Sequence, residues 1–307
     1  MNPSSNRAPA RRLFRPAALG LCLLALFLHP AWGADLRFPR FLYAAEGAKK
    51  IIEYGHDGQV AWEYPAEMSR DVWMLTNGHV LFCYNQDYNS AQNDNPSGVM
   101  EVTADKRIVW QFGTTGQVWS CQRLADGNTM VGAASQGKLL IVNPAGQVVQ
   151  EVKLLNKPGH SCIRNARQIP NGHFLVAEES ARAAREYSAD GKLVREIKVP
   201  FAPFSAVRLD NGNTVICGQK SLVEVDPADK VVWTLEGADL PEMGIRWFAG
   251  IQALPNGNLF ICNAGGKVPF LEVARDKRIV WQSGEDKTRF PMGHGIQRLD
   301  VLGRACK

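Results

Sequence analysis

The sequence predicts an all-β protein, a six-bladed β-propeller with four-stranded blades. The first observation is that the heptapeptide DKRIVWQ occurs twice, at 105–111 and again at 276–282. The second is that related phrases recur around both copies with a ragged period in the mid-forties. Units of this length that each hold four short strands are typical of propellers, whereas helical repeats would show a period near 3.6 residues.

The heptapeptide belongs to a phrase that occurs six times. The six segments are HDGQVAWEY, ADKRIVWQF, PAGQVVQEV, ADGKLVREI, ADKVVWTLE and RDKRIVWQS. We expect this phrase to form the last strand of each unit, with its large aromatic residue packed between neighbouring blades. Gln150 and Arg195 replace the aromatic residue in two adjacent units, which predicts a locally different outer edge there. The aligned positions, at intervals of 48, 40, 45, 38 and 48 residues, are Trp62, Trp110, Gln150, Arg195, Trp233 and Trp281.

A second phrase alternates with the first and predicts a hairpin in each unit. Its copies are LTNGHVLF, LADGNTMV, IPNGHFLV, LDNGNTVI and LPNGNLFI. Each reads as a short apolar strand, a tight Asx-Gly turn and a second apolar strand, because these dipeptides tolerate the positive φ angles of such turns. The sixth copy, GIQRLDVLGRAC, lies near the C-terminal end and lacks the clean turn.

The repeat is offset at its two ends, and this offset predicts how the ring closes. Phe41–Pro65 supplies only the later strands of a unit, whereas Gly293–Lys307 supplies an early strand. Joining the two segments completes the sixth blade, so the C-terminal strand should add to the N-terminal blade and leave no free sheet edge.

Residues 1–33 read as an export signal, which leaves residues 34–307 as the propeller. Four arginines precede the apolar run Ala17–Leu28, which is too short to span a bilayer. Removal of the leader lowers the formal net charge from +5 to +1, which argues against a nucleic-acid partner. We therefore expect a periplasmic or secreted monomer without a membrane span, exported by either the Sec or the twin-arginine route.

Six cysteines follow the leader. Cys83, Cys217 and Cys262 occupy one repeat position, which Gly or Ala fills in other units, so we interpret them as small buried residues with free thiols. Cys121 and Cys162 approach the channel end of neighbouring blades, and a disulfide between them stays open at this stage.

The two faces of the predicted ring differ, and the more variable one is where we expect function. Turns within the hairpins are uniformly tight, whereas the connections between blades are long and irregular. Variable loops on a rigid scaffold commonly carry binding and catalysis. Several Arg, two His and aromatic residues gather in these loops, predicting a pocket for a small anionic or aromatic molecule. These residues are His160, His294, Arg70, Arg164, Arg246, Arg289, Trp119, Phe204 and Trp247.

Two resemblances follow from these phrases. The aromatic-ended last strand resembles the repeats of pyrroloquinoline-quinone-type propellers, although six blades without a recognisable quinone centre lead us to expect no cofactor. HSCIRNARQIPNGHFLV and GHGIQRLD resemble the histidine-bearing repeats of periplasmic arylsulfate sulfotransferases. That resemblance implies His294 or His160 as the nucleophile and Arg164, Arg246 or Arg289 as the groups that stabilise the sulfate oxygens.

The leading functional hypothesis is a binding scaffold of the cell envelope, whose partner is a small ligand or an envelope protein. The incomplete catalytic sets favour it over the sulfotransferase-like enzyme. A third hypothesis is a calcium-dependent lactonase-like hydrolase. The repeat alignment places Asp71 and Asn165, two hard oxygen ligands, at one channel-lining level, together with Ser120, Ser205, Gly250 and Gly295. Two such ligands without a Glu are few for a calcium site.

Overall fold

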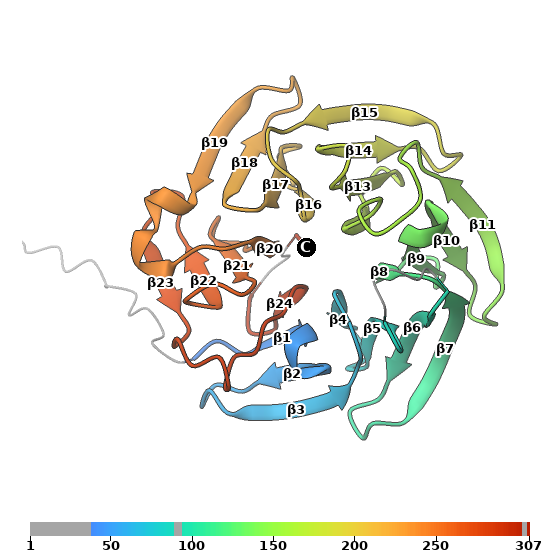
Figure 1. Cartoon of the computed structure of the whole chain (residues 1–307), viewed down its shortest axis with the longest axis horizontal. Helices are drawn as coiled ribbons and strands as arrows, with labels where there is room; N and C mark the ends of the chain where they lie inside the picture. The colour runs from blue at the N-terminus through green and yellow to red at the C-terminus, as the bar shows by residue number, and fades with distance from the viewer. Residues whose placement is uncertain (1–37, 89–93, 303–305) are drawn as a thin grey trace, which may run out of the picture. The chain divides into compact units, whose positions relative to one another are not determined.

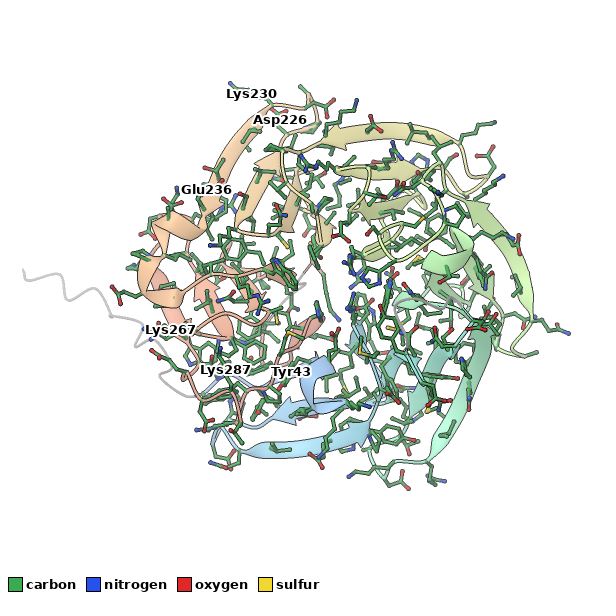
Figure 2. The ribbon with its side chains drawn as sticks, in the orientation of Figure 1. Tyr43, Asp226, Lys230, Glu236, Lys267 and Lys287 are labelled. Atoms are coloured by element: carbon green, nitrogen blue, oxygen red, sulfur yellow. The ribbon has the colours of Figure 1, made fainter. Side chains whose placement is uncertain are left out.

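The computed structural model describes residues 38–88, 94–302 and 306–307, so the expected leader lies outside the described residues. The described residues form six four-stranded antiparallel sheets set around a central axis (Figure 1). The predicted six-bladed β-propeller is thus confirmed. Side chains such as Lys230 and Glu236 point outward from the rim, whereas Tyr43 lies buried within the ring (Figure 2).

The blades follow one another along the chain, and each runs from an inner strand at the axis to an outer strand at the rim. Blade 1 consists of β24 (Ile296–Arg298), β1 (Phe41–Ala45), β2 (Lys50–Tyr54) and β3 (Val60–Pro65). Blade 2 consists of β4 (Val72–Met74), β5 (Val80–Asn85), β6 (Pro96–Val102) and β7 (Ile108–Thr115). Blade 3 consists of β8 (Val118–Arg123), β9 (Thr129–Ala133), β10 (Lys138–Val142) and β11 (Val148–Lys153).

The second half of the ring repeats this order. Blade 4 consists of β12 (Asn165–Gln168), β13 (Phe174–Glu178), β14 (Ala183–Tyr187) and β15 (Leu193–Lys198). Blade 5 consists of β16 (Ser205–Arg208), β17 (Thr214–Gly218), β18 (Ser221–Val225) and β19 (Val231–Glu236). Blade 6 consists of β20 (Phe248–Ala253), β21 (Leu259–Asn263), β22 (Phe270–Val273) and β23 (Ile279–Gln282). Short 3-10 turns η1 to η4 lie at Glu46–Ala48, Ala134–Gln136, Gly237–Asp239 and Pro241–Met243.

The ring closes as the sequence predicts. β24 pairs antiparallel with β1, so that Tyr43 lies opposite Ile296 and Phe41 opposite Arg298. A strand from the C-terminal end therefore forms the inner strand of the N-terminal blade, and each four-stranded sheet is complete. The apolar core fills the wedges between neighbouring blades.

The tight Asx-Gly turns share one local geometry. The glycine has a φ between +80 and +87°, which costs glycine little but would strain other residues. The preceding Asx side chain accepts a hydrogen bond of 3.0 Å from the backbone two residues on, which fixes the turn. These glycines are Gly78, Gly127, Gly172, Gly212 and Gly257.

The expectation of a different outer edge at Gln150 and Arg195 is wrong. At four of the six aligned positions in the described residues, the side chain donates a hydrogen bond to a backbone carbonyl in the third-to-fourth-strand turn of the next blade. Gln and Arg make this bond as Trp does, because each has an N–H donor at the end of a long side chain. The bonds run from Trp62 to Ala104, from Gln150 to Ala189, from Arg195 to Asp226 and from Trp233 to Arg275.

A buried glutamate in the third strand provides a further link between blades. Glu101 accepts a bond of 2.6 Å from Arg123, at the end of the inner strand of the next blade, and lies 2.7 Å from Nδ1 of His79. Glu186 makes the same contacts with Arg208 and His173. His79 and His173 lie in the Asx-Gly turns of the same blades as these glutamates and hold the two carboxylates in position. Blade 6 contacts blade 1 in the same way, through Glu272, Arg298 and Asn258.

Cys83, Cys121, Cys162, Cys217 and Cys262 have free thiols. The disulfide left open between Cys121 and Cys162 is absent because the two residues belong to different apolar clusters: Cys121 packs with Cys83, whereas Cys162 packs with Leu154 and Ile163. Within the described part of the chain, we find no helix long and apolar enough to cross a membrane.

Candidate functional site

Two rings of residues line the axis, with one residue from each blade. The first, which we call the channel level, lies opposite the small residues of the second strands, such as Cys83 and Gly132. It contains Asp71, Ser120, Asn165, Ser205, Gly250 and Gly295, as the repeat alignment predicts. The preceding residue in each blade belongs to the second ring, the mouth level, which lies toward the loop-rich face. It contains Arg70, Trp119, Arg164, Phe204, Ala249 and His294.

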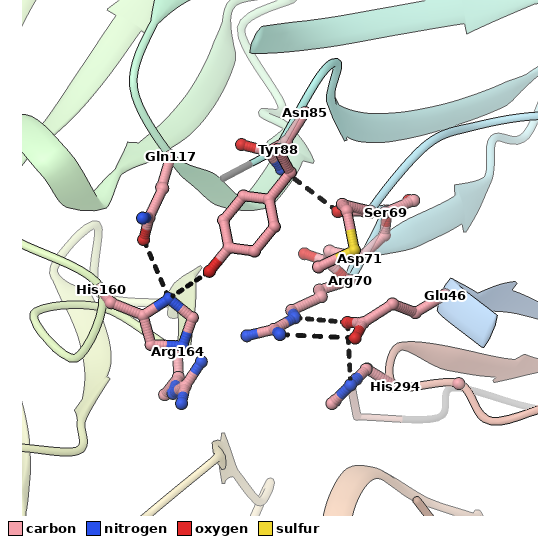
Figure 3. Close-up of polar contacts among 12 residues, drawn as sticks. Glu46, Ser69, Arg70, Asp71, Asn85, Tyr88, Gln117, His160, Arg164 and His294 are labelled. Carbon is pink, nitrogen blue, oxygen red and sulfur yellow. Dashed lines mark hydrogen bonds and ion pairs between the residues drawn. The ribbon is translucent and has the colours of Figure 1, made fainter. Parts of the chain in front are cut away.

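Glu46 in η1 holds two residues of the mouth level (Figure 3). Its carboxylate accepts a hydrogen bond of 2.6 Å from Nε of Arg70 and lies 3.1 Å from Nε2 of His294. Burial alone would raise the pKa of Glu46, but the hydrogen bond from His294 and the charge of Arg70 outweigh it and lower this pKa below its usual range. Burial also lowers the pKa of His294, which is 5% exposed. Glu46 is therefore ionised, and it holds Arg70 and His294 in place at the mouth level.

Arg164 forms the second anchored cation of the mouth. Its Nε donates a hydrogen bond of 2.5 Å to Glu179, and its guanidinium lies 4.7 Å from the ring centroid of Phe204. The ring of Phe204 stacks in turn on Trp247, at 5.5 Å, and on His294, at 6.4 Å. The Arg164 side chain is only 8% exposed, yet its Nη1 has no hydrogen-bond partner among the described residues. A buried cation with an unused donor costs free energy, which an anionic acceptor would offset.

His160 lies at the same mouth, fixed by three neighbours (Figure 3). Its Nδ1 is 3.0 Å from Oε1 of Gln117 and 3.1 Å from the hydroxyl of Tyr88, and its ring packs edge-on against Trp119, at 5.4 Å. In the tautomer with its hydrogen on Nδ1, the ring donates to this amide oxygen, and Nε2 keeps its lone pair. Burial, with smaller effects from Arg164 and Arg70, lowers the pKa of His160 to about 4. His160 is therefore a neutral, oriented imidazole at neutral pH.

Most of the predicted ligand-binding residues come together, but Arg289 does not join them. Arg70 stacks on Trp119, with its guanidinium carbon 4.1 Å from the ring centroid. Arg246 is exposed and lies over Trp247, with its guanidinium carbon 5.2 Å from that ring centroid. Arg289 lies at the wedge of blades 6 and 1, where it bonds the carbonyl of Gly58 and covers Phe290. The long loop before β24 carries Arg289 outward, and loop paths of this kind are not readable from sequence.

The sequence analysis did not single out several residues that organise the site: Glu46, Glu179, Tyr88 and Gln117. Glu46 and Glu179 occupy the same place in the second-to-third-strand turns of blades 1 and 4, each closed by a bond of 3.1 Å to a left-handed residue. The phrases AAEGAKK and AEESARA could have revealed this equivalence, since each places a Glu three residues before a basic residue at the turn.

The two candidate metal ligands both face a guanidinium. Asp71 accepts hydrogen bonds of 2.6 and 2.8 Å from Arg167, and the amide oxygen of Asn165, in its favoured orientation, accepts bonds of 2.9 and 3.2 Å from the same group. Within the described residues, no cluster of three or more His, Cys, Asp or Glu is arranged to hold a metal ion. The positive charge of Arg167 opposes a cation at this level.

The channel below the mouth is narrow. The cavity bordered by Arg164, Phe204 and His294 has a volume of about 20 Å³, which is room for about one water molecule. A larger molecule therefore has to bind at the mouth rather than inside the channel. There it meets two arginines, a neutral imidazole, an ionised carboxylate and three aromatic faces.

Comparisons with known proteins establish the fold. No protein-family model and no curated protein match the chain. Among solved structures, a protein of unknown function from Bacteroides caccae is 26% identical, with a TM-score of 0.72 over 84% of this chain and 98% of that chain. A streptogramin B lyase is 13% identical, with a TM-score of 0.61 over 84% of this chain and 83% of its own. The periplasmic gluconolactonase PpgL of Pseudomonas aeruginosa is 12% identical, with a TM-score of 0.54 over 86% of this chain and 99% of that chain.

These likenesses and the six-sheet ring define the class of the chain: it is a six-bladed β-propeller. The structures similar to it include a lyase, a lactonase and a protein of unknown function. A shared propeller fold does not fix an activity, because function is carried by the site built on the scaffold.

Proposed function

We propose that the chain is an exported propeller of the cell envelope, which binds a small anionic, ring-bearing molecule at the mouth of its loop-rich face. The observation that carries this proposal is Arg164, whose buried guanidinium keeps one unpartnered nitrogen beside Phe204. A carboxylate or sulfate oxygen is a suitable acceptor for that nitrogen. The stacked rings of Phe204 and Trp247 offer a flat apolar surface to the ring of the ligand.

The pairing of the charged groups at the mouth favours an anionic ligand over a cationic one. Glu46 and Glu179 already neutralise Arg70 and Arg164, so a cationic ligand would find no unpaired carboxylate among these residues. An incoming anion instead meets Arg164 Nη1 in a poorly solvated position, where charge-assisted hydrogen bonds are strong.

A thermal-shift series tests this proposal. The probes are 4-nitrophenyl sulfate, benzoate and inorganic sulfate, with the uncharged benzamide as the ring-only control. A ligand at 100 times its dissociation constant adds about 2.7 kcal/mol to the free energy of unfolding, which moves the melting temperature measurably. We expect the ring-bearing anions to stabilise the protein most.

Two variants decide where the anion binds. Arg164→Gln should abolish the shift, whereas the matched control Arg289→Gln, outside the mouth, should keep it. A shift of equal size in both variants would contradict the proposal. The absence of any shift with all of the anions would favour an envelope protein as the partner instead.

A second candidate function, sulfuryl transfer, is favoured by the geometry of His160. A neutral imidazole with an oriented lone pair on Nε2 can attack sulfur, so that an N–S bond forms as the S–O bond to the leaving phenolate breaks. The test is release of 4-nitrophenolate from 4-nitrophenyl sulfate in the presence of a phenol acceptor. We expect His160→Ala to lower the rate by about 100-fold or more, since nucleophile and proton-transfer roles have at least that magnitude. Binding without turnover would exclude this candidate and leave the binding proposal intact.

The lactonase-like alternative has the fold likeness to PpgL in its favour. Against it, Asp71 and Asn165 direct their oxygens at Arg167. The likeness to quinone-type propellers concerns the repeats, and we propose no quinone cofactor.

A further inference from the structure

The end of the described chain enters the channel from the tight-turn face. Cys306 forms an antiparallel bridge with Ala253, at the end of β20, through hydrogen bonds of 2.8 and 3.0 Å. The next residue, Lys307, lies at the axis of the ring, where Figure 1 marks the chain end. Its side chain is 4% exposed, although lysine is rarely buried without a partner.

Three groups surround the Lys307 amine. It donates a hydrogen bond to the carbonyl of Val72, lies 4.1 Å from the ring centroid of Trp73, and is 3.8 Å from Oδ1 of Asp71. A carbonyl oxygen accepts a hydrogen bond from a primary amine whether or not the amine is charged, whereas Arg167, which is paired with Asp71, opposes the charged form.

Asp71 contributes charge rather than a hydrogen bond. Its two oxygens already accept bonds from both terminal nitrogens of Arg167 and from the backbone of Val72 and Cys121, at 3.1 Å each. Four bonds fill the acceptor sites of a carboxylate. The contacts particular to the amine are therefore with Val72 and Trp73, which lie on the same inner strand, β4.

A groove lies beside this position and shares Trp73 with it. The groove opens among the tight turns of blades 2 to 4 and has a volume of about 870 Å³, within the range of ligand-binding pockets. Trp73 lines it together with Gln122, Gln168 and Gln297. One aromatic residue therefore borders both the groove and the Lys307 amine.

We propose that this end of the channel is a binding site for a primary alkylamine, and that Lys307 of the same chain occupies it. Lys307 also lines the narrow cavity that Arg164, Phe204 and His294 border from the mouth. A lysine side chain of an extended peptide, or a free alkylamine, would compete with Lys307 for Val72 and Trp73.

Amine labelling of the unmodified protein tests whether Lys307 is seated. An N-hydroxysuccinimide ester is added under native conditions, and each lysine is followed by peptide mapping. Lys307 should react several-fold more slowly than Lys192, which is 82% exposed, and equally fast after denaturation. Equal rates in the native protein would overturn the proposal.

Chemical rescue tests whether the site is selective for an amine. Lys307→Gly leaves the position of the aminobutyl group empty, and n-butylamine should raise the melting temperature of this variant more than that of the wild type. The matched variant Lys307→Met fills the space without the amine and should gain nothing, and n-butanol should not replace n-butylamine. Rescue by n-butanol to the same extent, or equal effects of n-butylamine on all three proteins, would contradict an amine site.

Discussion

His160 carries the clearest electrostatic signature at the mouth. Burial, together with Arg164 and Arg70, lowers its pKa to about 4, whereas an unfolded histidine titrates near 6.5. Since the folded protein resists protonation there, the unfolded state binds more protons between these two values. The stability that neutral His160 contributes is therefore complete above about pH 6.5 and is lost as the pH falls toward 4.

Titration of the His160 ring by NMR should give a midpoint well below 6.5, the ordinary value for histidine. In thermal unfolding, His160→Gln should lose less stability than the wild type between pH 6.5 and 4.5, because it lacks the imidazole whose protonation favours the unfolded state. If both proteins lost stability in parallel, the depressed pKa would be contradicted.

Lys307 shows the same effect of burial. Burial, opposed by Asp71 and reinforced by Arg167, lowers the pKa of Lys307 to about 7. Cys121 and Cys83 also face this amine, and they favour its charged form. An undocked lysine titrates near 10.4, so seating of Lys307 should strengthen as the pH rises from about 7 to 10. Protection of Lys307 from labelling, relative to Lys192, should accordingly be greater at pH 9 than at pH 7; a constant ratio would argue against the buried position.

At the residue scale, the sequence predicts which residues occupy equivalent positions in the blades better than it predicts which side chains they contact. The channel level, including Asp71 and Asn165, follows from the alignment because inner strands repeat in register. The sequence analysis did not predict the carboxylates that hold Arg70 and Arg164, since a Glu occupies this turn position in blades 1 and 4, whereas blade 3 has Ala134 in the same kind of turn. Arg167 also went unnoticed, although it occupies the acidic and amide groups that suggested calcium.

At the scale of strands, a bulge is repeated in every blade of the described ring. The pairing of the third and fourth strands shifts register at one position, for example between Glu101 and Val102 and between Glu186 and Tyr187. The residue before the shift is a buried Glu in five blades and Ile141 in blade 3. In blades 2, 4 and 6 the bulge aims this carboxylate at the Asx-Gly turn of its own blade and at the arginine of the next inner strand.

Glu101→Gln should therefore destabilise the protein by about 2 kcal/mol, because it leaves Arg123 partly buried without its charged acceptor. The side chains of Glu101 and Arg123 are 10% and 21% exposed. Lys192→Met is the matched control, since its pair with Asp190 is largely solvated and should contribute little to the free energy of unfolding. Denaturant unfolding of both variants measures the difference, and equal effects would show that the Glu–Arg contact does not hold the blades.

At the scale of the whole molecule, the closure of the ring depends on one very short strand. β24 has three residues, of which Ile296 is 1% exposed and packs with Phe41 and Tyr43. Ile296→Ala should cost about 2–4 kcal/mol through lost burial and a cavity. Val148→Ala, at an outer-strand position that is 43% exposed, should cost much less in the same denaturant titration. A small effect of Ile296→Ala would indicate that the ring does not depend on this closing strand.

The ring as a whole was predictable because its signals are local and repeated: Asx-Gly turns, outer-strand phrases and an offset between the ends. The functional site was predictable only in part. Its residues come from loops of unequal length, such as the one that carries Arg289 away from the mouth to Gly58. The path of Lys307 into the channel has no counterpart in the repeat.

The central claim is that the mouth binds a ring-bearing anion through Arg164. The most direct test is a crystal structure of the protein soaked with the anion that gives the largest thermal shift. We predict an oxygen of that anion within hydrogen-bond distance of Arg164 Nη1, and its ring against Phe204 and Trp247. An anion bound elsewhere, with Arg164 Nη1 still unpartnered, would contradict the account.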